Sequence, residues 1–173
     1  MLHYLRSGYG TVLVYVADNE YRYFKFLSRV HAVEDYYPIF VTDMHGSADE
    51  RKQLYPDYKA NRTAAEPSFY EQVDFILELG AMIGTVYKQP GREADDLAGA
   101  FVERYAATNE ITLLTVDADW LQLLQKNVRV IQLKTNGRHV LWDDALFFAE
   151  KKIAPKQLVS LKALVGDGSD NIP

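Results

Sequence analysis

Three carboxylates lie within four consecutive residues of the stretch Arg92-Glu-Ala-Asp-Asp-Leu97. Like charges at this spacing repel one another unless a cation lies among them. Acidic residues are also common at the start of a helix, where the macrodipole favours them. Carboxylate oxygens are the ligands that Mg²⁺ and Mn²⁺ prefer, so the cluster points to a divalent metal site that acts on phosphate groups.

Five further acids, each placed after an apolar segment, extend this pattern along the chain. They are Asp43, Asp117, Asp119, Asp167 and Asp170. In open α/β sheets ligands collect at the carboxyl ends of strands, so acids that follow strands can converge on one site. Two divalent ions about 3.5–4 Å apart could share a scissile phosphate, one activating a water and the other stabilising the leaving oxygen. The alternative is a set of surface acids in solvated turns.

The rest of the composition excludes several other kinds of site. Cysteine is absent from the 173 residues, which rules out disulfides and thiolate metal sites and suits a reducing cytoplasm. The sequence has neither a Walker-type phosphate loop nor a Gly-x-Ser-x-Gly nucleophile motif. We find no signal-peptide pattern and no apolar run long enough to span a membrane, so we expect a cytoplasmic protein. The net charge of −5 argues against a nucleic-acid partner unless bound cations reverse the sign inside a metal pocket.

Residues 44–62 form the one distinctly basic stretch, in which cationic and aromatic side chains are interleaved. Its members are Arg51, Lys52, Tyr55, Tyr58, Lys59 and Arg62. Cations can follow a phosphate backbone and rings can stack on bases, so the stretch suits single-stranded or frayed nucleic acid. A solvated surface loop can have the same composition, and composition alone leaves both interpretations open.

Apolar patterning predicts strands that alternate with helices. We expect strands over 11–16, 38–43, 85–88, 111–116 and 128–133, and a further strand over 139–142 after a hairpin turn at 136–137. We expect helices over 21–33, 63–84, 97–107, 120–124, 143–152 and 155–165. This alternation predicts one α/β domain over residues 1–173, with a mainly parallel sheet and helices on both faces.

Two of these helices carry predictions about packing. The helix over 63–84 has apolar residues at helical spacing and is expected to cover one face of the sheet. In the helix over 155–165, Leu158, Leu161 and Leu164 are expected to point inward, and Gly166 is expected to cap its end.

Four sequence motifs, in this order, carry a family resemblance. They are Tyr55-Pro-Asp-Tyr-Lys-Ala-Asn-Arg62, Glu93-Ala-Asp-Asp96, Thr115-Val-Asp-Ala-Asp119 and Leu161-Lys-Ala-Leu-Val-Gly-Asp-Gly-Ser-Asp-Asn-Ile-Pro173. Over about residues 21–173 the chain resembles the 5′→3′ exonuclease / flap endonuclease family, which includes phage 5′ nucleases and the 5′-nuclease domain of bacterial DNA polymerase I. Four motifs in the family's order are far more specific than any one of them.

The resemblance implies a PIN-like α/β core in which residues 44–62 form part of a helical arch that admits a 5′ single strand. It implies a structure-specific nuclease of DNA replication and repair with two Mg²⁺ or Mn²⁺ ions. Such an enzyme cuts DNA, or RNA in RNA–DNA hybrids, near single-strand/duplex junctions and releases 5′-phosphorylated products. We expect it to be a monomer.

The resemblance also implies roles for individual residues. By position, the first ion would be held by Asp43, Glu93, Asp95 and Asp96. The second would be held by Asp117, Asp119 and Asp170, with Asp167 in support. Lys59 resembles the family's arch lysine that contacts the scissile phosphate, Arg62 would assist it, and Tyr58 would stack on a base near the cut. Arg51 and Lys52 are expected to bind nucleic acid, and Asp43, Asp96 and Asp119 are expected to be catalytic together with Lys59 and Arg62.

Two departures from the family pattern concern the ends of the chain. Family members usually open with a central strand that ends in Asp-Gly, and aligned back from Asp43 that Asp would fall just before Met1. We favour this truncated start over the alternative, in which residues 11–16 form a shortened first strand and Asp18 supplies the ligand. The chain also stops just before the Gly-rich helix–turn–helix segment that follows Asn-Ile-Pro in the family and binds duplex DNA.

Other functions remain as alternatives. The chain could be an inactive nucleic-acid-binding fragment of such a nuclease. It could be a phosphatase that uses Asp117 and Asp119 as a nucleophile and acid pair, although the nuclease motifs give no reason to expect an aspartyl-phosphate. A PIN-type ribonuclease is a variant of the nuclease interpretation, but the Tyr-Lys-Ala-Asn-Arg motif argues against it.

Overall fold

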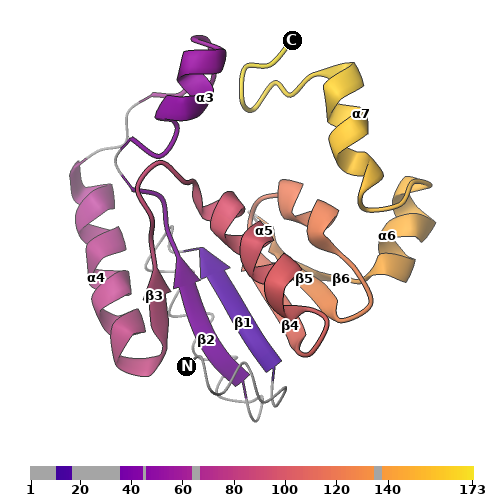
Figure 1. Cartoon of the computed structure of the whole chain (residues 1–173), viewed down its shortest axis with the longest axis horizontal. Coiled ribbons are helices and arrows are strands. Elements are labelled where there is room, and N and C mark those ends of the chain that lie inside the picture. Colours follow the sequence, from indigo (N-terminus) through magenta and orange to yellow (C-terminus); the bar gives the residue numbers. More distant parts are fainter. Residues whose placement is uncertain (1–10, 17–35, 45, 64–66, 135–137) are drawn as a thin grey trace.

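One six-stranded sheet, in the order β3-β2-β1-β4-β5-β6, forms the centre of the molecule (Figure 1). The computed structural model describes residues 11–16, 36–44, 46–63, 67–134 and 138–173. The strands are β1 (Thr11–Val16), β2 (Tyr36–Val41), β3 (Thr85–Tyr87), β4 (Glu110–Thr115), β5 (Val128–Leu133) and β6 (His139–Trp142). All neighbours run parallel except β5 and β6, which are antiparallel. This confirms the predicted mainly parallel sheet.

The helices fall close to their predicted ranges, with one exception. They are α3 (Asp49–Leu54), α4 (Pro67–Ile83), α5 (Ala94–Tyr105), the 3₁₀ helix η1 (Asp119–Leu123), α6 (Asp144–Lys151) and α7 (Gln157–Val165). The exception is α3, which lies in the basic stretch 44–62, where apolar patterning predicted no helix. The helix predicted over 21–33 and the turn predicted at 136–137 lie outside the described residues. Among the helices of the described ranges, none is long and apolar enough to cross a membrane.

Helices cover both faces of the sheet, as the alternation of elements predicted. Successive side chains of a strand point to opposite faces, so β2 contributes to two separate apolar clusters. Ile39 packs in the larger cluster, with residues of α5, η1 and α6. Phe40 packs in the smaller cluster, where Ile76 and Leu77 of α4 cover the other face.

The central position of the sheet belongs to β1, which pairs with β2 on one side and β4 on the other. The strand order reverses direction there, and ligands in open α/β sheets bind at the carboxyl ends of strands at such a switch point. Residues 11–16, the shortened first strand of the alternative interpretation, form β1 in this sheet. Asp18, the ligand in that alternative, lies outside the described residues.

Helix α7 corrects one packing prediction. Leu158 packs partly against the larger core cluster, but Leu161 is 42% exposed and Leu164 is 86% exposed. The inward orientation predicted for Leu161 and Leu164 is therefore wrong, because the main contacts of α7 are with η1 and leave these two side chains toward solvent. Gly166 does end the helix, with φ at 80°.

Gly84 allows the close approach of the turn between α4 and β3 to strand β2. A Cβ at this position would lie 2.3 Å from the backbone oxygen of Pro38. We expect Gly84→Ala to lower the free energy of unfolding by about 2 kcal/mol, because a backbone atom cannot yield as a flexible side chain does. Gly99→Ala is the matched control, since its Cβ would meet only Leu123 at 3.8 Å, and it should gain about 0.5–1 kcal/mol of helix stability. Equal denaturation midpoints for the two variants would contradict this prediction.

Candidate functional site

The acids predicted to converge lie along one edge of the sheet. Asp43 follows β2, Glu93 precedes α5 after β3, and Asp117 follows β4. Because these strands are parallel, their carboxyl ends meet at the same edge. In Figure 1 the arrowheads of β1 and β2 point toward the side of the molecule that carries α3 and the C-terminal segment.

The start of α5 draws three carboxylates together. The helix begins at Ala94, three residues before its predicted start, and Glu93 is its N-cap. The Glu93 backbone N–H donates to Asp96 Oδ2 at 3.1 Å, and the Ala94 N–H donates to Asp43 Oδ1 at 2.6 Å. The first N–H groups of a helix have no partner within the helix, and its dipole favours negative charge there. The helix terminus therefore positions these acids.

Glu93 is the most enclosed acid of the site, with 2% of its side chain exposed. Its Oε1 accepts from Lys59 Nζ at 2.5 Å, and its Oε2 accepts from Tyr58 Oη at 2.9 Å and from Arg51 Nη1. Arg51 Nη2 also donates to Asp96 Oδ1 at 2.7 Å. A buried carboxylate is costly unless it is paired and hydrogen-bonded, and here residues 51–59 supply every one of these side-chain partners.

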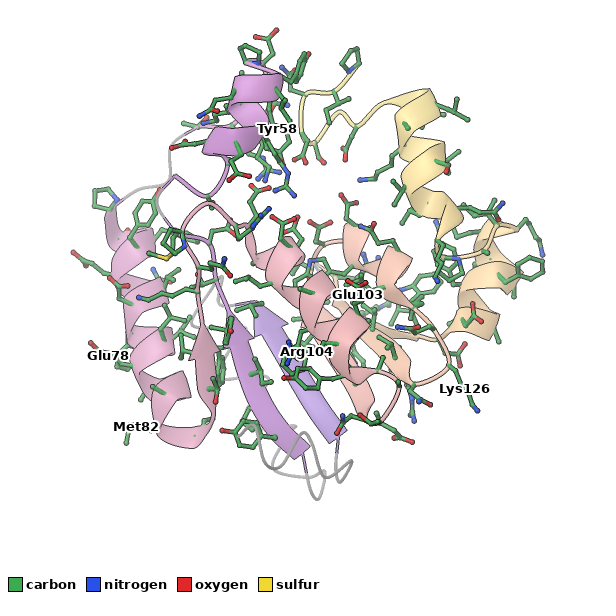
Figure 2. All side chains as sticks on the ribbon, in the orientation of Figure 1. Tyr58, Glu78, Met82, Glu103, Arg104 and Lys126 are labelled. Carbon is green, nitrogen blue, oxygen red and sulfur yellow. The ribbon has the colours of Figure 1, made fainter. Side chains whose placement is uncertain are left out.

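The turn that follows α3 docks on the loop after α7, although more than a hundred residues separate them. The Lys59 N–H donates to the Asp170 carbonyl at 2.9 Å, and Arg62 Nη2 donates to Asp170 Oδ1 at 2.6 Å. Asn61 Nδ2 donates to the Gly168 carbonyl at 3.0 Å. Tyr58 Oη, beside Glu93, also lies 3.2 Å from Asp170 Oδ2. Figure 2 places Tyr58 between α3 and the C-terminal segment.

The acids and bases that these contacts bring together form one set, which we call the Glu93 group. Its members are Asp43, Glu93, Asp95, Asp96 and Asp170 with Arg51, Lys59 and Arg62.

Burial shapes the ionisation of the Glu93 group. It lowers the pKa of Lys59, although the charge of Asp170 opposes this shift. It raises the pKa of the Tyr58 hydroxyl, and the charge of Asp170 acts in the same direction. It also raises the pKa of Asp95, although the charge of Lys59 favours the ionised form.

A second set of charges, which we call the Lys162 group, consists of Lys162 with Asp117, Asp119 and Asp167. Lys162 Nζ donates to Asp167 Oδ2 at 2.5 Å and to Asp119 Oδ1. The Asp119 N–H donates to Asp117 Oδ1 at 2.9 Å, which aligns these two acids at the end of β4. Hydrogen bonds from Lys162 and then Ser169 lower the pKa of Asp167 to about 2, whereas burial raises the pKa of Asp119 in spite of the same lysine.

Three of the expected site residues have contacts in the structure that the sequence did not predict. Asp170 was expected beside Asp117 and Asp119, but its carboxylate contacts Tyr58 and Arg62 in the Glu93 group. Tyr58 was expected to stack on a base, and in the structure it is 6% exposed with its hydroxyl donating to Glu93. Arg51 was expected to bind nucleic acid, but its guanidinium pairs with acids of the site.

The sequence-based prediction of the site missed Lys162. It lies in the last turn of α7 and within the motif that starts at Leu161, five residues before Asp167. A lysine in a motif otherwise chosen for its acids was the available signal. Lys52, by contrast, is exposed on α3 as a residue that contacts nucleic acid would be.

The charges of the two groups fit divalent cations. Within the described part of the chain no three acidic or histidine side chains are grouped as a ligand set, and Arg51, Lys59 and Lys162 contact carboxylate oxygens instead. The five acids and three bases of the Glu93 group leave two negative charges uncompensated. The three acids of the Lys162 group and its single lysine also leave two. Each excess equals the charge of one divalent ion, and an all-oxygen donor set suits Mg²⁺ or Mn²⁺.

Comparison with known proteins gives consistent matches. A family model described as "5′-3′ exonuclease, N-terminal resolvase-like domain" matches residues 16–154. A 5′-3′ exonuclease of Bacillus subtilis (strain 168) is 38% identical over 149 residues, which cover 83% of this chain and 50% of that protein. A DNA polymerase I of Treponema pallidum (strain Nichols) is 36% identical over 71% of this chain and 12% of that protein. The chain thus spans half or less of the length of these relatives.

Solved structures share the fold. The T5 D15 protein co-crystallised with metal ions superposes with a TM-score of 0.73 at 21% identity, covering 93% of this chain and 68% of that one. A T5 D15 flap endonuclease in a pseudo-enzyme–product complex with DNA and metal ions gives a TM-score of 0.65 at 22% identity, covering 92% and 68%. The likeness confirms the predicted PIN-like α/β fold.

Proposed function

The chain belongs to the 5′-3′ exonuclease family, and we propose that it is a metal-dependent nuclease that hydrolyses phosphodiesters of DNA at 5′ ends and flaps. The observation that carries this proposal is the arrangement of carboxylates at one edge of the sheet, each group with two uncompensated negative charges, beneath a basic segment. The proposed site consists of the acidic edge of the sheet and the basic segment above it, with the nucleic-acid strand passing between them. The named activities of the relatives, which are longer chains, support it.

We assign the acids to two ions. Asp43, Glu93, Asp95 and Asp96 would hold the first, and Asp117 and Asp119 would hold the second with support from Asp167. Asp170, expected as a ligand of the second ion, contacts Tyr58 and Arg62 and would lie on the side of the first. Bound there, Mg²⁺ or Mn²⁺ would lower the pKa of an attacking water and stabilise the leaving oxygen. The chain's contribution is to fix these carboxylates through the α5 terminus and through Lys162.

The basic segment would position the nucleic acid. Lys59 and Arg62 lie beside the acids and would donate hydrogen bonds to the phosphate that is cut. Lys52, exposed on α3, would follow the phosphate backbone farther along the strand. Residues 44–62 would serve as the arch over a 5′ single strand.

The remaining proposals concern substrate range and organisation. We propose that the enzyme also acts on RNA in RNA–DNA hybrids, because the contacts assigned to Lys52, Lys59 and Arg62 are to phosphates and carry no base specificity. We further propose that residues 1–173 form one 5′-nuclease core that works as a monomer in the cytoplasm, and the single continuous sheet supports one core.

The test is cleavage of a 5′-labelled flap substrate by the chain as it stands. We expect product only with added Mg²⁺ or Mn²⁺ and none in excess EDTA, because removal of the ions leaves two unbalanced acidic groups facing a phosphate. A covalently closed circular duplex, which has no 5′ end and no flap, is the control substrate. Intact flap at every metal concentration would overturn the proposal for this chain. Salt-dependent binding without turnover would instead support a nucleic-acid-binding role.

A further inference from the structure

Two adjacent basic residues of α3, Arg51 and Lys52, have the same expected role but different surroundings. Lys52 is exposed, and within the described ranges it forms no ion pair. Arg51 is 37% exposed and turns inward, where its two terminal nitrogens contact two different acids, Glu93 and Asp96. Of these two neighbours, only Lys52 is therefore directed toward a nucleic-acid strand that would pass over the outer surface of α3.

The contacts of Arg51 are of a kind that a simple positive charge does not reproduce. Its planar guanidinium donates through separate nitrogens to Glu93 Oε2 and Asp96 Oδ1, which holds the two carboxylates in a fixed relation. Asp96 is further held by the Glu93 backbone N–H. Helix α3 itself has no buried residue, so these ion pairs connect it to the start of α5.

We propose that Arg51 is a positioning residue of the acidic site and not a contact to nucleic acid. It orients Glu93 and Asp96, which are assigned above to the first metal ion, and it offsets part of their mutual repulsion. The inference rests on the proposed nuclease function, since it names a role within that site. Partners that orient metal ligands typically matter by about 10–100-fold in metal affinity or activity.

A pair of charge-conserving substitutions separates the two roles. In Arg51→Lys one ammonium cannot reproduce the planar two-nitrogen contact, so we expect Mn²⁺ affinity, measured by calorimetry without DNA, to fall about tenfold. We expect kcat on the flap to fall by a similar factor with KM within about twofold. Arg129→Lys, the matched control at an exposed position of β5 outside both acidic groups, should leave all three within about twofold, because its arginine pairs with the exposed Glu110 and not with an acid of the site. Wild-type Mn²⁺ affinity and kcat in Arg51→Lys would overturn the proposal.

Charge-removing substitutions give an independent readout. Each lost phosphate contact lowers the salt slope of DNA binding by about one, so Lys52→Met should reduce this slope, measured in EDTA. Arg51→Met should leave the slope unchanged. A reduced slope in Arg51→Met would make Arg51 a phosphate contact and overturn the proposal.

One further measurement distinguishes failure of the positioning role from failure of the nuclease function. If the wild-type chain neither binds Mn²⁺ nor cleaves the flap, the proposed function fails, but the role of Arg51 is still decided by amide hydrogen exchange. The N–H groups of Asp96 and Leu97 should exchange faster in Arg51→Lys than in Lys52→Arg. Equal exchange rates would overturn the positioning role.

Discussion

Asp119→Ala is expected to lower the rate of flap cleavage on the order of a thousandfold, which corresponds to about 4 kcal/mol of transition-state stabilisation. Asp119 is the first residue of η1, at the end of the loop that leaves β4, a strand inside the sheet, and its backbone is fixed by the contact with Asp117. Its loss removes one of the three acids of the Lys162 group and leaves Lys162 paired with Asp167 alone. The group would then carry one uncompensated negative charge and would match a divalent ion poorly.

The loss should be catalytic and not structural. Asp119 is partly exposed and begins a short 3₁₀ helix, so its truncation removes little from the apolar core. The control is Asp74→Ala, an exposed acid on α4, which should cleave as the wild type does. The measurement is the initial rate of flap cleavage by both variants in saturating Mg²⁺, with circular dichroism to verify that each variant is folded. Cleavage by Asp119→Ala within tenfold of the control would remove Asp119 from the catalytic set.

The sequence predicted the elements that are defined by local patterns. Strands such as Glu110–Thr115 have a buried run of Ile and Leu residues, and parallel strands end at one edge, so the convergence of Asp43, Glu93 and Asp117 could be inferred. The start of α5 was predicted three residues late, because the acids that were read as ligands also cap the helix.

The counter-ions of the acids could not be predicted in the same way. Arg51 pairs with Glu93 across 42 positions, and Tyr58 contacts Asp170 across 112. Such pairs depend on how loops pack, and the composition of a loop gives only the types of its side chains. For the same reason Tyr58 was expected to stack on a base but is buried beside Glu93.

Helix α7 illustrates a different limit. Periodicity shows which residues share a face of a helix, and Leu158, Leu161 and Leu164 have suitable spacing. It does not show which face meets the core, and here Leu164 points to solvent. The same helix carries Lys162 toward the acids, so its place beside η1 serves the candidate site more than the core.

Glu93→Gln is expected to abolish cleavage and to lower the free energy of unfolding by about 3 kcal/mol, the low end of the cost of breaking a buried ion pair. Glutamine keeps the volume but removes the charge that Arg51 and Lys59 share, and its NH₂ group would face one of these donors. Glu103→Gln, an exposed position on the same helix, is the control in urea unfolding, and Figure 2 shows Glu103 away from Tyr58. An unfolding midpoint for Glu93→Gln equal to that of the control would show that the ion pairs of Glu93 do not hold the basic segment in place. It would also remove the reason for placing that segment over the acids.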